Sequence, residues 1–106
     1  MTKDDLRRLA LSLPGVEEKS HFDKADFRVK NKIFVSLKDD ATGVVKLSLE
    51  DQRVMVDAEP KIFHPIPGGW GAKGWTKIVL ANANEVTLKS ALQTAWRTVA
   101  PKSMQG

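Results

Sequence analysis

The sequence has 106 residues and contains no cysteine. A disulfide framework and a thiolate metal site are therefore excluded, and the composition is typical of a reducing compartment. A chain of this length still buries roughly two-thirds of the surface that its unfolded form exposes, which is enough to fold without covalent cross-links. We expect residues 1–106 to form a single domain.

The sequence also lacks an apolar run of membrane-spanning length. Its first residues mix both signs of charge, and Ser12 interrupts the apolar stretch that follows them. This pattern is neither a signal peptide nor a transmembrane segment. Internal repeats and low-complexity segments are absent too. We therefore expect a cytoplasmic protein with no membrane partner.

Groups that carry catalysis or bind metals are scarce. The two histidines, His21 and His64, form neither an H-x-H nor an H-E-x-x-H spacing. No serine lies in a G-x-S-x-G turn, and His64 as a general base would need an orienting partner. We therefore expect a protein that is not an enzyme and has no catalytic residues, no metal site and no cofactor.

Basic residues outnumber acidic ones, and the excess is uneven along the chain. The net charge is +4, yet residues 1–60 hold eleven Lys/Arg and twelve Asp/Glu. Residues 61–106 hold one acidic residue, Glu85, and six basic ones: Lys61, Lys73, Lys77, Lys89, Arg97 and Lys102. This asymmetry is compatible with an anionic partner. The alternative is that these lysines only keep the surface soluble.

Apolar residues at helical spacing predict a helix at the N-terminus and a short one in the middle. Thr2 and Asp5 resemble a capping box, and Pro14-Gly15 ends the first helix at about Leu13. The middle helix spans Glu50–Ala58. Its apolar residues expected to point inward are Val54, Met55 and Ala58.

A longer helix is predicted near the C-terminus. Asn84 is its N-cap and Pro101 follows its end. Its apolar stripe consists of Leu88, Ala91, Leu92, Ala95, Trp96 and Val99.

Strands are predicted between the helices, where the apolar period changes to two. Asp26–Lys30 and Lys32–Leu37 form a hairpin with a tight turn at Asn31. Further strands are expected over 17–22, 44–49 and 75–80, and the Pro- and Gly-rich segment 63–74 is expected to be a loop. The residues expected on the core side are Ile33, Val35, Leu37, Val45, Leu47 and Leu49.

Together these elements predict an α+β fold. We expect a two-layer sandwich with an antiparallel sheet of about five strands and with N-terminal, short middle and long C-terminal helices. The helices should cover one face of the sheet, and the other face should be in contact with water.

Residues 69–74 match the G-x-G-x-x-G pattern of dinucleotide-binding loops. The required strand before the motif and helix after it are missing, because prolines precede it and a strand-like segment follows it. The glycines could still admit a ligand close to the backbone, with charge from Lys73 and stacking by Trp70. The alternative is that they serve turns while Trp70 and Trp75 pack on the sheet.

Basic residues also surround the predicted hairpin. Lys24, Arg28, Lys30, Lys32 and Lys38 could follow a phosphate backbone, or they could form an ordinary solvated sheet face. The neighbouring acidic pair at 39–40 opposes phosphate binding at that tip.

Four segments resemble the MmcQ/YjbR-like family: residues 13–17, 27–34, 74–80 and 95–102. The chain differs from the family at Asn31, where glycine is usual, and at Ala95-Trp96, where Ser-Tyr is common. The second change removes a phenolic hydroxyl. The resemblance implies a small bacterial domain, topologically similar to secretion chaperones, and a DNA-binding role proposed for the family from a double-wing arrangement of hairpins. It supplies no catalytic residues.

Our leading hypothesis is a small non-enzymatic domain that contacts DNA phosphates through a basic surface. The residues that would bind are Lys73 and Lys77, with Arg28, Lys30 and Lys32 adding charge and Trp70 stacking. One alternative is a chaperone-like module that binds a protein or peptide at open sheet edges. Another is a small-molecule pocket beneath the 63–75 loop.

Overall fold

The computed structural model describes residues 1–21 and 24–105. Its helices are α1 (Lys3–Leu11), α2 (Leu49–Ala58), α3 (Gly69–Ala72), α4 (Glu85–Val99), α5 (Lys102–Gln105) and the 3-10 turn η1 (Leu80–Asn82). Its strands are β1 (Val16–His21), β2 (Lys24–Val29), β3 (Lys32–Asp39), β4 (Thr42–Lys46), β5 (Phe63–Pro65) and β6 (Trp75–Val79). Phe22, expected at the end of the first strand, lies outside the described residues.

The strands form one antiparallel sheet in the order β1-β2-β3-β4-β6-β5. The predicted α+β class and antiparallel sheet are confirmed. The structure has one strand more than the five expected. This additional strand, β5, and the short helix α3 both come from the segment that was expected to be a loop. A strand of three residues is too short to show a period of two, and Pro65 is tolerated because β5 lies at the sheet edge.

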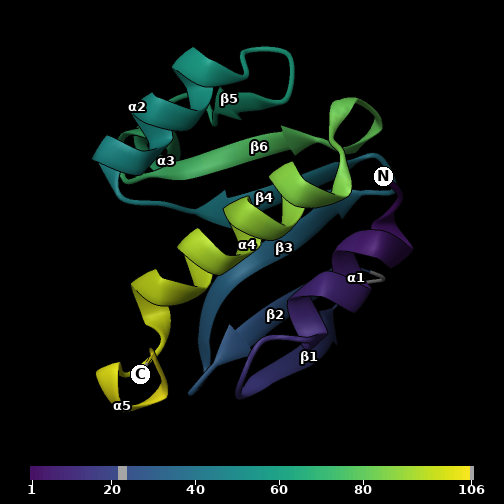
Figure 1. Cartoon of the computed structure of the whole chain (residues 1–106), viewed down its shortest axis with the longest axis vertical. Helices are drawn as coiled ribbons and strands as arrows, with labels where there is room; N and C mark the ends of the chain where they lie inside the picture. Colours follow the sequence, from purple (N-terminus) through teal and green to yellow (C-terminus); the bar gives the residue numbers. More distant parts are fainter. Residues whose placement is uncertain (22–23, 106) are drawn as a thin grey trace.

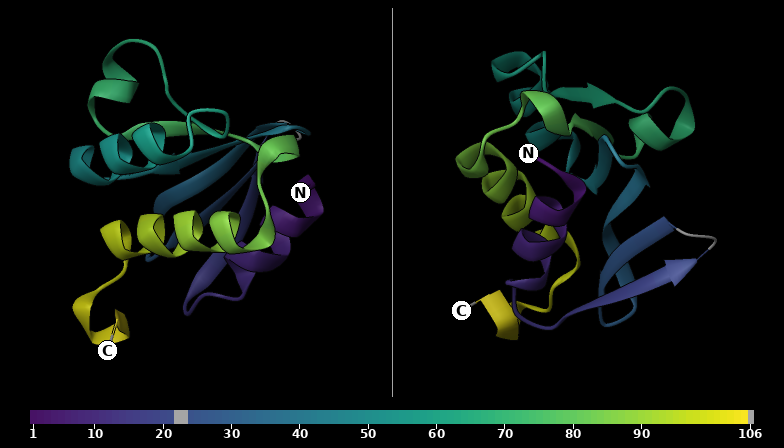
Figure 2. Two further views of the ribbon diagram at one scale, coloured as in Figure 1. Left: turned by 45° about the horizontal axis from the view of Figure 1, so that its top comes forward. Right: turned by 90° about the vertical axis from the view of Figure 1, so that its right-hand side faces the viewer.

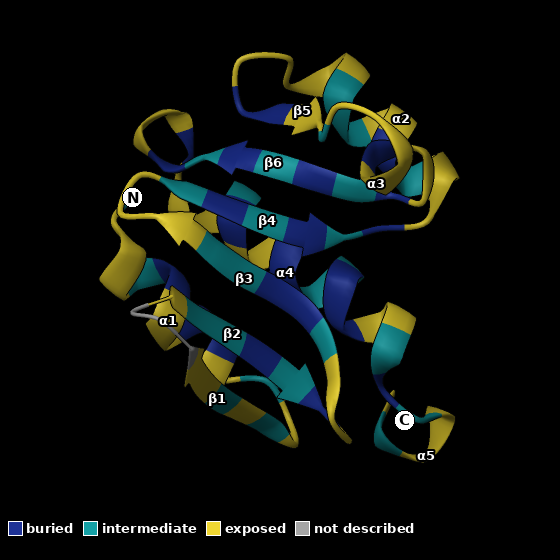
Figure 3. Cartoon of the chain, turned by 180° about the vertical axis from the view of Figure 1, so that it is seen from behind, coloured by how far each residue is buried: buried dark blue, intermediate teal, exposed yellow. Residues whose placement is uncertain are grey.

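Helices α1 and α4 pack side by side over one face of the sheet (Figure 1). Helix α2 lies beside the β5 edge, and α5 follows α4 at the C-terminus (Figure 2). On the opposite face, α3 lies in front of the start of β6 (Figure 3). We call this opposite face, which α1 and α4 leave uncovered, the open face. Within the described part of the chain, no helix is long and apolar enough to cross a membrane.

The predicted caps are present. The backbone N–H of Thr2 donates to Asp5 Oδ2 at 2.8 Å, and the N–H of Asp5 donates to Thr2 Oγ1 at 3.2 Å. The backbone N–H and the hydroxyl of Thr2 both donate to Asp5 Oδ2, and these two hydrogen bonds lower the pKa of the Asp5 carboxyl. Asn84 Oδ1 accepts from the N–H of Thr87 at 2.8 Å and caps α4. Helix α1 ends at Leu11 rather than Leu13.

The turn between β2 and β3 has the expected form. Lys30 and Asn31 both have positive φ values, 50° and 68°. A two-residue type I′ hairpin turn needs this conformation at both positions, and Asn adopts it more readily than most residues. Asn31 therefore adopts the positive φ that the sequence predicted for this turn.

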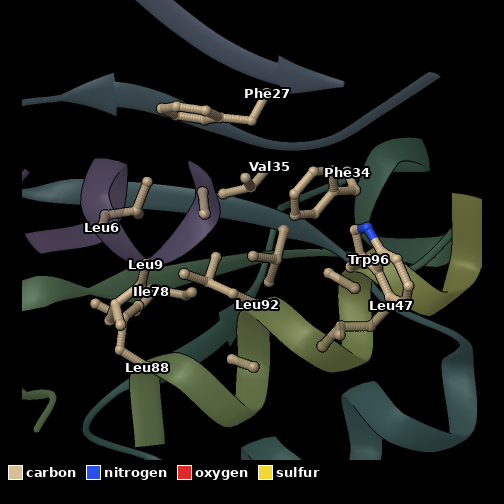
Figure 4. Packing of buried hydrophobic residues seen from close by; sticks show 14 of the residues in the cluster. Leu6, Leu9, Phe27, Phe34, Val35, Leu47, Ile78, Leu88, Leu92 and Trp96 are labelled. Carbon is tan, nitrogen blue, oxygen red and sulfur yellow. The ribbon is translucent and has the colours of Figure 1, made fainter. Parts of the chain in front are cut away.

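The register of β3 corrects the predicted core assignment. Phe27 pairs with Val35 and Arg28 pairs with Ile33, so Phe34 is the extra residue of a bulge. As a result Phe34 and Val35 both point toward α4 and are fully buried (Figure 4). The expectation that Ile33 faces the core is wrong, because the bulge turns it to the open face. Leu37 packs partly against the core, as expected.

Three further expectations about side-chain direction, for Val54, Ala58 and Leu49, are wrong. Val54 of α2 is 61% exposed, and Ala58 is exposed as well; only Met55 is partly buried. Leu49 begins α2 instead of ending β4, and it is exposed. Helix α2 packs against the β5 edge and a neighbouring loop rather than over the apolar sheet face. The residue of α2 that is buried is polar, Gln52.

The core lies between the sheet and the helices α1 and α4 (Figure 4). Its fully buried residues include Leu6 from α1, Leu88 and Leu92 from α4, and Val45 and Ile78 from the sheet. Trp96 is also buried here, and its Nε1–H donates to the carbonyl oxygen of Pro14 at 2.9 Å. The indole at this position is thus a core residue on the helix side.

Candidate functional site

Strand pairing determines which side chains lie on the open face, because directly paired residues point to the same side. Phe27, Val35 and Val45 form a buried row toward the helices. The alternating row points away from them. It consists of Lys19, Asp26, Ser36, Val44, Lys77 and His64, each paired with the next across the six strands.

A groove of about 410 Å³ crosses this open face. Its apolar lining comes from Ile33, Val44, Ile66, Trp70 and Trp75, and its polar lining comes from Asp26, Ser36 and Lys38. We call it the sheet groove. The loop 63–75 forms one of its walls, close to where the sequence suggested a small-molecule pocket. Most of its surface is apolar although it faces solvent, which is typical of a ligand site.

The two tryptophans of this wall differ in burial. Trp70, at the second position of α3, is 63% exposed, whereas Trp75 at the start of β6 is half-buried. Their rings meet edge to face, with centroids 6.2 Å apart and planes at 72°. Lys73 Nζ lies 5.7 Å from the centroid of Trp70, and Lys46 Nζ lies 5.9 Å from that of Trp75. Each ring therefore has a cation within cation–π distance.

The glycines of the 69–74 motif serve the backbone of this wall. A Cβ on Gly71 would lie 1.8 Å from the carbonyl oxygen of Ile66, and one on Gly74 would lie 1.8 Å from that of Leu47. Gly74 also has a φ of 102°. Strand β6, and not a helix, follows the motif, as the sequence indicated, so the arrangement of a dinucleotide-binding loop is not formed here.

Gln52 holds this wall from the inside. Its Nε2 donates to the carbonyl oxygens of Gly71 and Trp75, at 3.1 and 3.3 Å, and to Thr76 Oγ1 at 3.0 Å. Thr76 Oγ1 in turn donates to the carbonyl oxygen of Gly74 at 3.0 Å. Sequence reasoning missed Gln52. The available signal was its spacing of three from Met55, which places a polar side chain on the inward side of α2.

The predicted binding residues are only partly together. Trp70 lines the sheet groove and Lys73 ends α3 beside it, while Lys77 lies on the open face between Val44 and His64. Lys30 and Lys32 are exposed in and next to the β2–β3 turn. This turn lies at the same end of the strands as α3, but several strands away from it (Figure 3).

Arg28 also lies on the open face, but its charge is already compensated. Its Nε and Nη2 donate to the two carboxylate oxygens of Asp26 at 2.8 and 3.1 Å, and Nη1 donates to Asn31 Oδ1 at 3.1 Å. The hydrogen bonds to Asp26 raise the pKa of Arg28. A bidentate pair of this kind fixes the guanidinium and leaves it less available to a ligand.

The lysines of the open face differ from Arg28 because, in the part of the chain that the structure describes, they are not held in ion pairs. Among residues 1–21 and 24–105, no ion pair involves Lys38, Lys46, Lys73 or Lys77. On the side of α1 and α4, by contrast, Arg7 pairs with Glu18 and Arg8 pairs with Glu85. These ammonium groups around the sheet groove are therefore not held in ion pairs within the described residues. Sequence reasoning missed Lys46 and did not connect Lys38 to the tryptophans, since only the register brings them together.

The described residues contain no group of three or more His, Cys, Asp or Glu side chains that could hold a metal ion. His64 is exposed on β5, where it pairs with Lys77. The chemistry that the open face offers is thus aromatic and apolar contact combined with ammonium groups.

Comparison with known proteins gives a family and a fold. The YjbR family model matches residues 11–98. The crystal structure of Deinococcus radiodurans protein DR2400, described with a DUF419 domain, is similar with a TM-score of 0.78 and 22% sequence identity, over 98% of this chain and 85% of that one. No curated protein matches the sequence.

Proposed function

The chain belongs to the YjbR family, and we propose that it is a non-enzymatic domain that binds nucleic acid through the open face of its sheet. The observation that carries the proposal is a set of four lysines that have no ion-pair partner within residues 1–21 and 24–105 and lie around the groove that the exposed Trp70 lines. These lysines are Lys38, Lys46, Lys73 and Lys77. A cationic surface with an aromatic side chain is the combination that binds a phosphate backbone and its bases.

The distribution of acidic groups favours the same face. The carboxylates of Asp40, Glu18 and Glu85 pair with Lys3, Arg7 and Arg8 on the helix side, so they do not cancel the charge of the groove. On the open face, Asp26 is engaged by Arg28. In this proposal Arg28 positions Asp26 and the turn, and the exposed Lys30 adds charge at that end. Lys32 pairs with the buried Val29 and therefore points to the helix side, so it is not part of the open face.

A second candidate is an apolar peptide or small molecule, favoured by the apolar lining of the sheet groove. Peptide binding by strand addition is less well supported. One sheet edge, β1, carries Glu17, Glu18 and Lys19, and the other, β5, contains Pro65. Charges and proline at edges are typical of strands protected against pairing with another chain.

The test is fluorescence anisotropy of labelled single-stranded and duplex DNA at several salt concentrations. Wild type should bind, with an affinity that falls steeply as salt rises. The double variant Lys73→Glu/Lys77→Glu should weaken binding by about tenfold or more and reduce the salt slope by about two, because each lost phosphate contact lowers the slope by about one.

The matched control is Lys89→Glu/Lys102→Glu, which makes the same change in net charge at exposed positions of α4 and α5. It should lose much less affinity than the open-face variant. Equal losses in the two variants would contradict a defined site and indicate attraction by net charge alone. Wild type that fails to bind even at low salt would overturn the proposal.

A further inference from the structure

We further propose that the nucleic acid held on the open face is single-stranded, with an unpaired base stacking on Trp70 and entering the sheet groove. This inference rests on the proposed function and specifies the ligand of the same site. It is carried by the shape and lining of the groove, by the exposure of Trp70 and by the position of the lysines.

The lining of the groove selects against a duplex. Ile33, Val44 and Trp75 present apolar surface on the open face. A duplex keeps the faces of its bases stacked inside and presents phosphates outward, so it would contact only the rim and leave this surface in water. An unpaired base has an exposed π-face that removes apolar surface from water when it stacks on an aromatic ring.

Trp70 has the properties of a stacking platform. It is 63% exposed, yet the segment that carries it is held in place by the hydrogen bonds from Gln52 to Gly71 and Trp75. Close backbone contact at Gly71 and Gly74 restricts the same segment further. Because the platform is ordered before the ligand arrives, little conformational entropy is lost on binding.

The lysines are positioned for the phosphates that flank an inserted base. Lys73 and Lys46 each lie within 6 Å of a tryptophan ring centroid, at 5.7 and 5.9 Å. Lys38 lines the groove away from α3, and Lys77 lies on the strand that Trp75 begins. A flexible single strand can bend so that its bases meet the rings while its phosphates meet these ammonium groups, which a stiff duplex cannot do.

The experiment compares three labelled oligonucleotides of equal length: a single-stranded oligothymidylate, a duplex and a single strand with abasic sites. Binding to wild type, Trp70→Ala, Trp70→Phe and the Lys89→Glu/Lys102→Glu control is measured by anisotropy at fixed salt. Wild type should bind the intact single strand at least about tenfold tighter than the duplex or the abasic strand. Tryptophan emission should be quenched on binding.

Trp70→Ala should weaken single-strand binding by about tenfold and remove most of the quenching, while Trp70→Phe keeps part of the affinity because it keeps a ring. Since Trp70 is exposed, both variants should stay folded, which circular dichroism checks. Duplex and intact single strand bound equally, or an abasic strand bound as tightly as the intact one, would overturn this inference and leave the proposed function standing. No binding to any of the three would contradict both.

Discussion

At the scale of single residues, Gly74 has the clearest structural task. Its φ of 102° belongs to a region that side-chain-bearing residues rarely adopt, and a Cβ would lie 1.8 Å from the carbonyl oxygen of Leu47. The N–H of Leu47 also donates to the carbonyl oxygen of Gly74 at 3.0 Å. Glycine here lets the chain pass closely over the end of β4 and start β6 in register.

We expect Gly74→Ala to lower the free energy of unfolding by about 2 kcal/mol or more, because it adds both backbone strain and a clash with backbone. Urea denaturation measures the change. The same substitution at Gly69 is the control, since a Cβ there meets nothing within 4 Å. Gly69→Ala should be neutral or stabilising by up to about 1 kcal/mol. Equal losses of unfolding free energy in the two variants would show that the close contact with Leu47 does not contribute to the effect of Gly74→Ala.

Phe34 shows how a single extra residue in β3 changes which side chains of the strand face the core. Alternation placed Ile33, Val35 and Leu37 on the core side, and this holds for Val35 and partly for Leu37. The bulge inserts Phe34 beside Val35 in the core and sends Ile33 to the sheet groove. Regular alternation cannot reveal a bulge, because the pattern of apolar residues is the same whether the extra residue lies at 33 or 34.

At the scale of elements, the contact between α2 and the wall of the sheet groove is polar. Gln52 is 8% exposed and its amide serves Gly71, Trp75 and Thr76 at once. Such a contact fixes the relative position of the two segments more precisely than apolar packing does, because hydrogen bonds depend on direction. Helix α2 thus acts as a support for α3 and Trp70.

Replacing Gln52 by Ala should therefore loosen the wall and destabilise the protein. The carbonyl oxygens of Gly71 and Trp75 would lose a buried donor, which costs about 1–3 kcal/mol of unfolding free energy. Relative to wild type, Gln52→Ala should accelerate hydrogen exchange more at the backbone amides of residues 71–76 than at other amides. Arg53→Ala, at the next and exposed position of α2, should change neither quantity appreciably. Unchanged exchange in Gln52→Ala would mean that the glycine contacts alone hold α3.

At the scale of the whole molecule, the basic surface of the open face is assembled from both halves of the chain. The basic excess of residues 61–106 contributes Lys73 and Lys77, but Lys38 and Lys46 come from the half of the chain that has no such excess. Pairing of β3 with β4 and of β4 with β6 brings these four lysines to one face. The charge asymmetry seen along the sequence is thus only part of the basic surface.

We expect residues 1–106 to unfold as one cooperative domain. Side chains from α1, α4 and the sheet belong to a single buried cluster, so neither layer keeps its apolar face covered without the other. Far-UV circular dichroism and the fluorescence of the Trp70→Phe variant, which reports on Trp75 and the buried Trp96, should give the same urea midpoint. Two separate midpoints would contradict a single domain.

The sequence by itself determined the class of fold, the three longer helices, the hairpin at Asn31 and the ends marked by Thr2, Asn84 and the prolines. These follow from local chemistry: capping, helical or two-residue periodicity, and backbone preferences within a few residues. Only the tertiary structure decided that Ile33 leaves the core, that Gln52 is buried against residues 71–76, and that Trp70 shares the open face with lysines from three strands. Strand register, bulges and helix placement depend on contacts between residues far apart in the chain, and a local pattern carries no record of them.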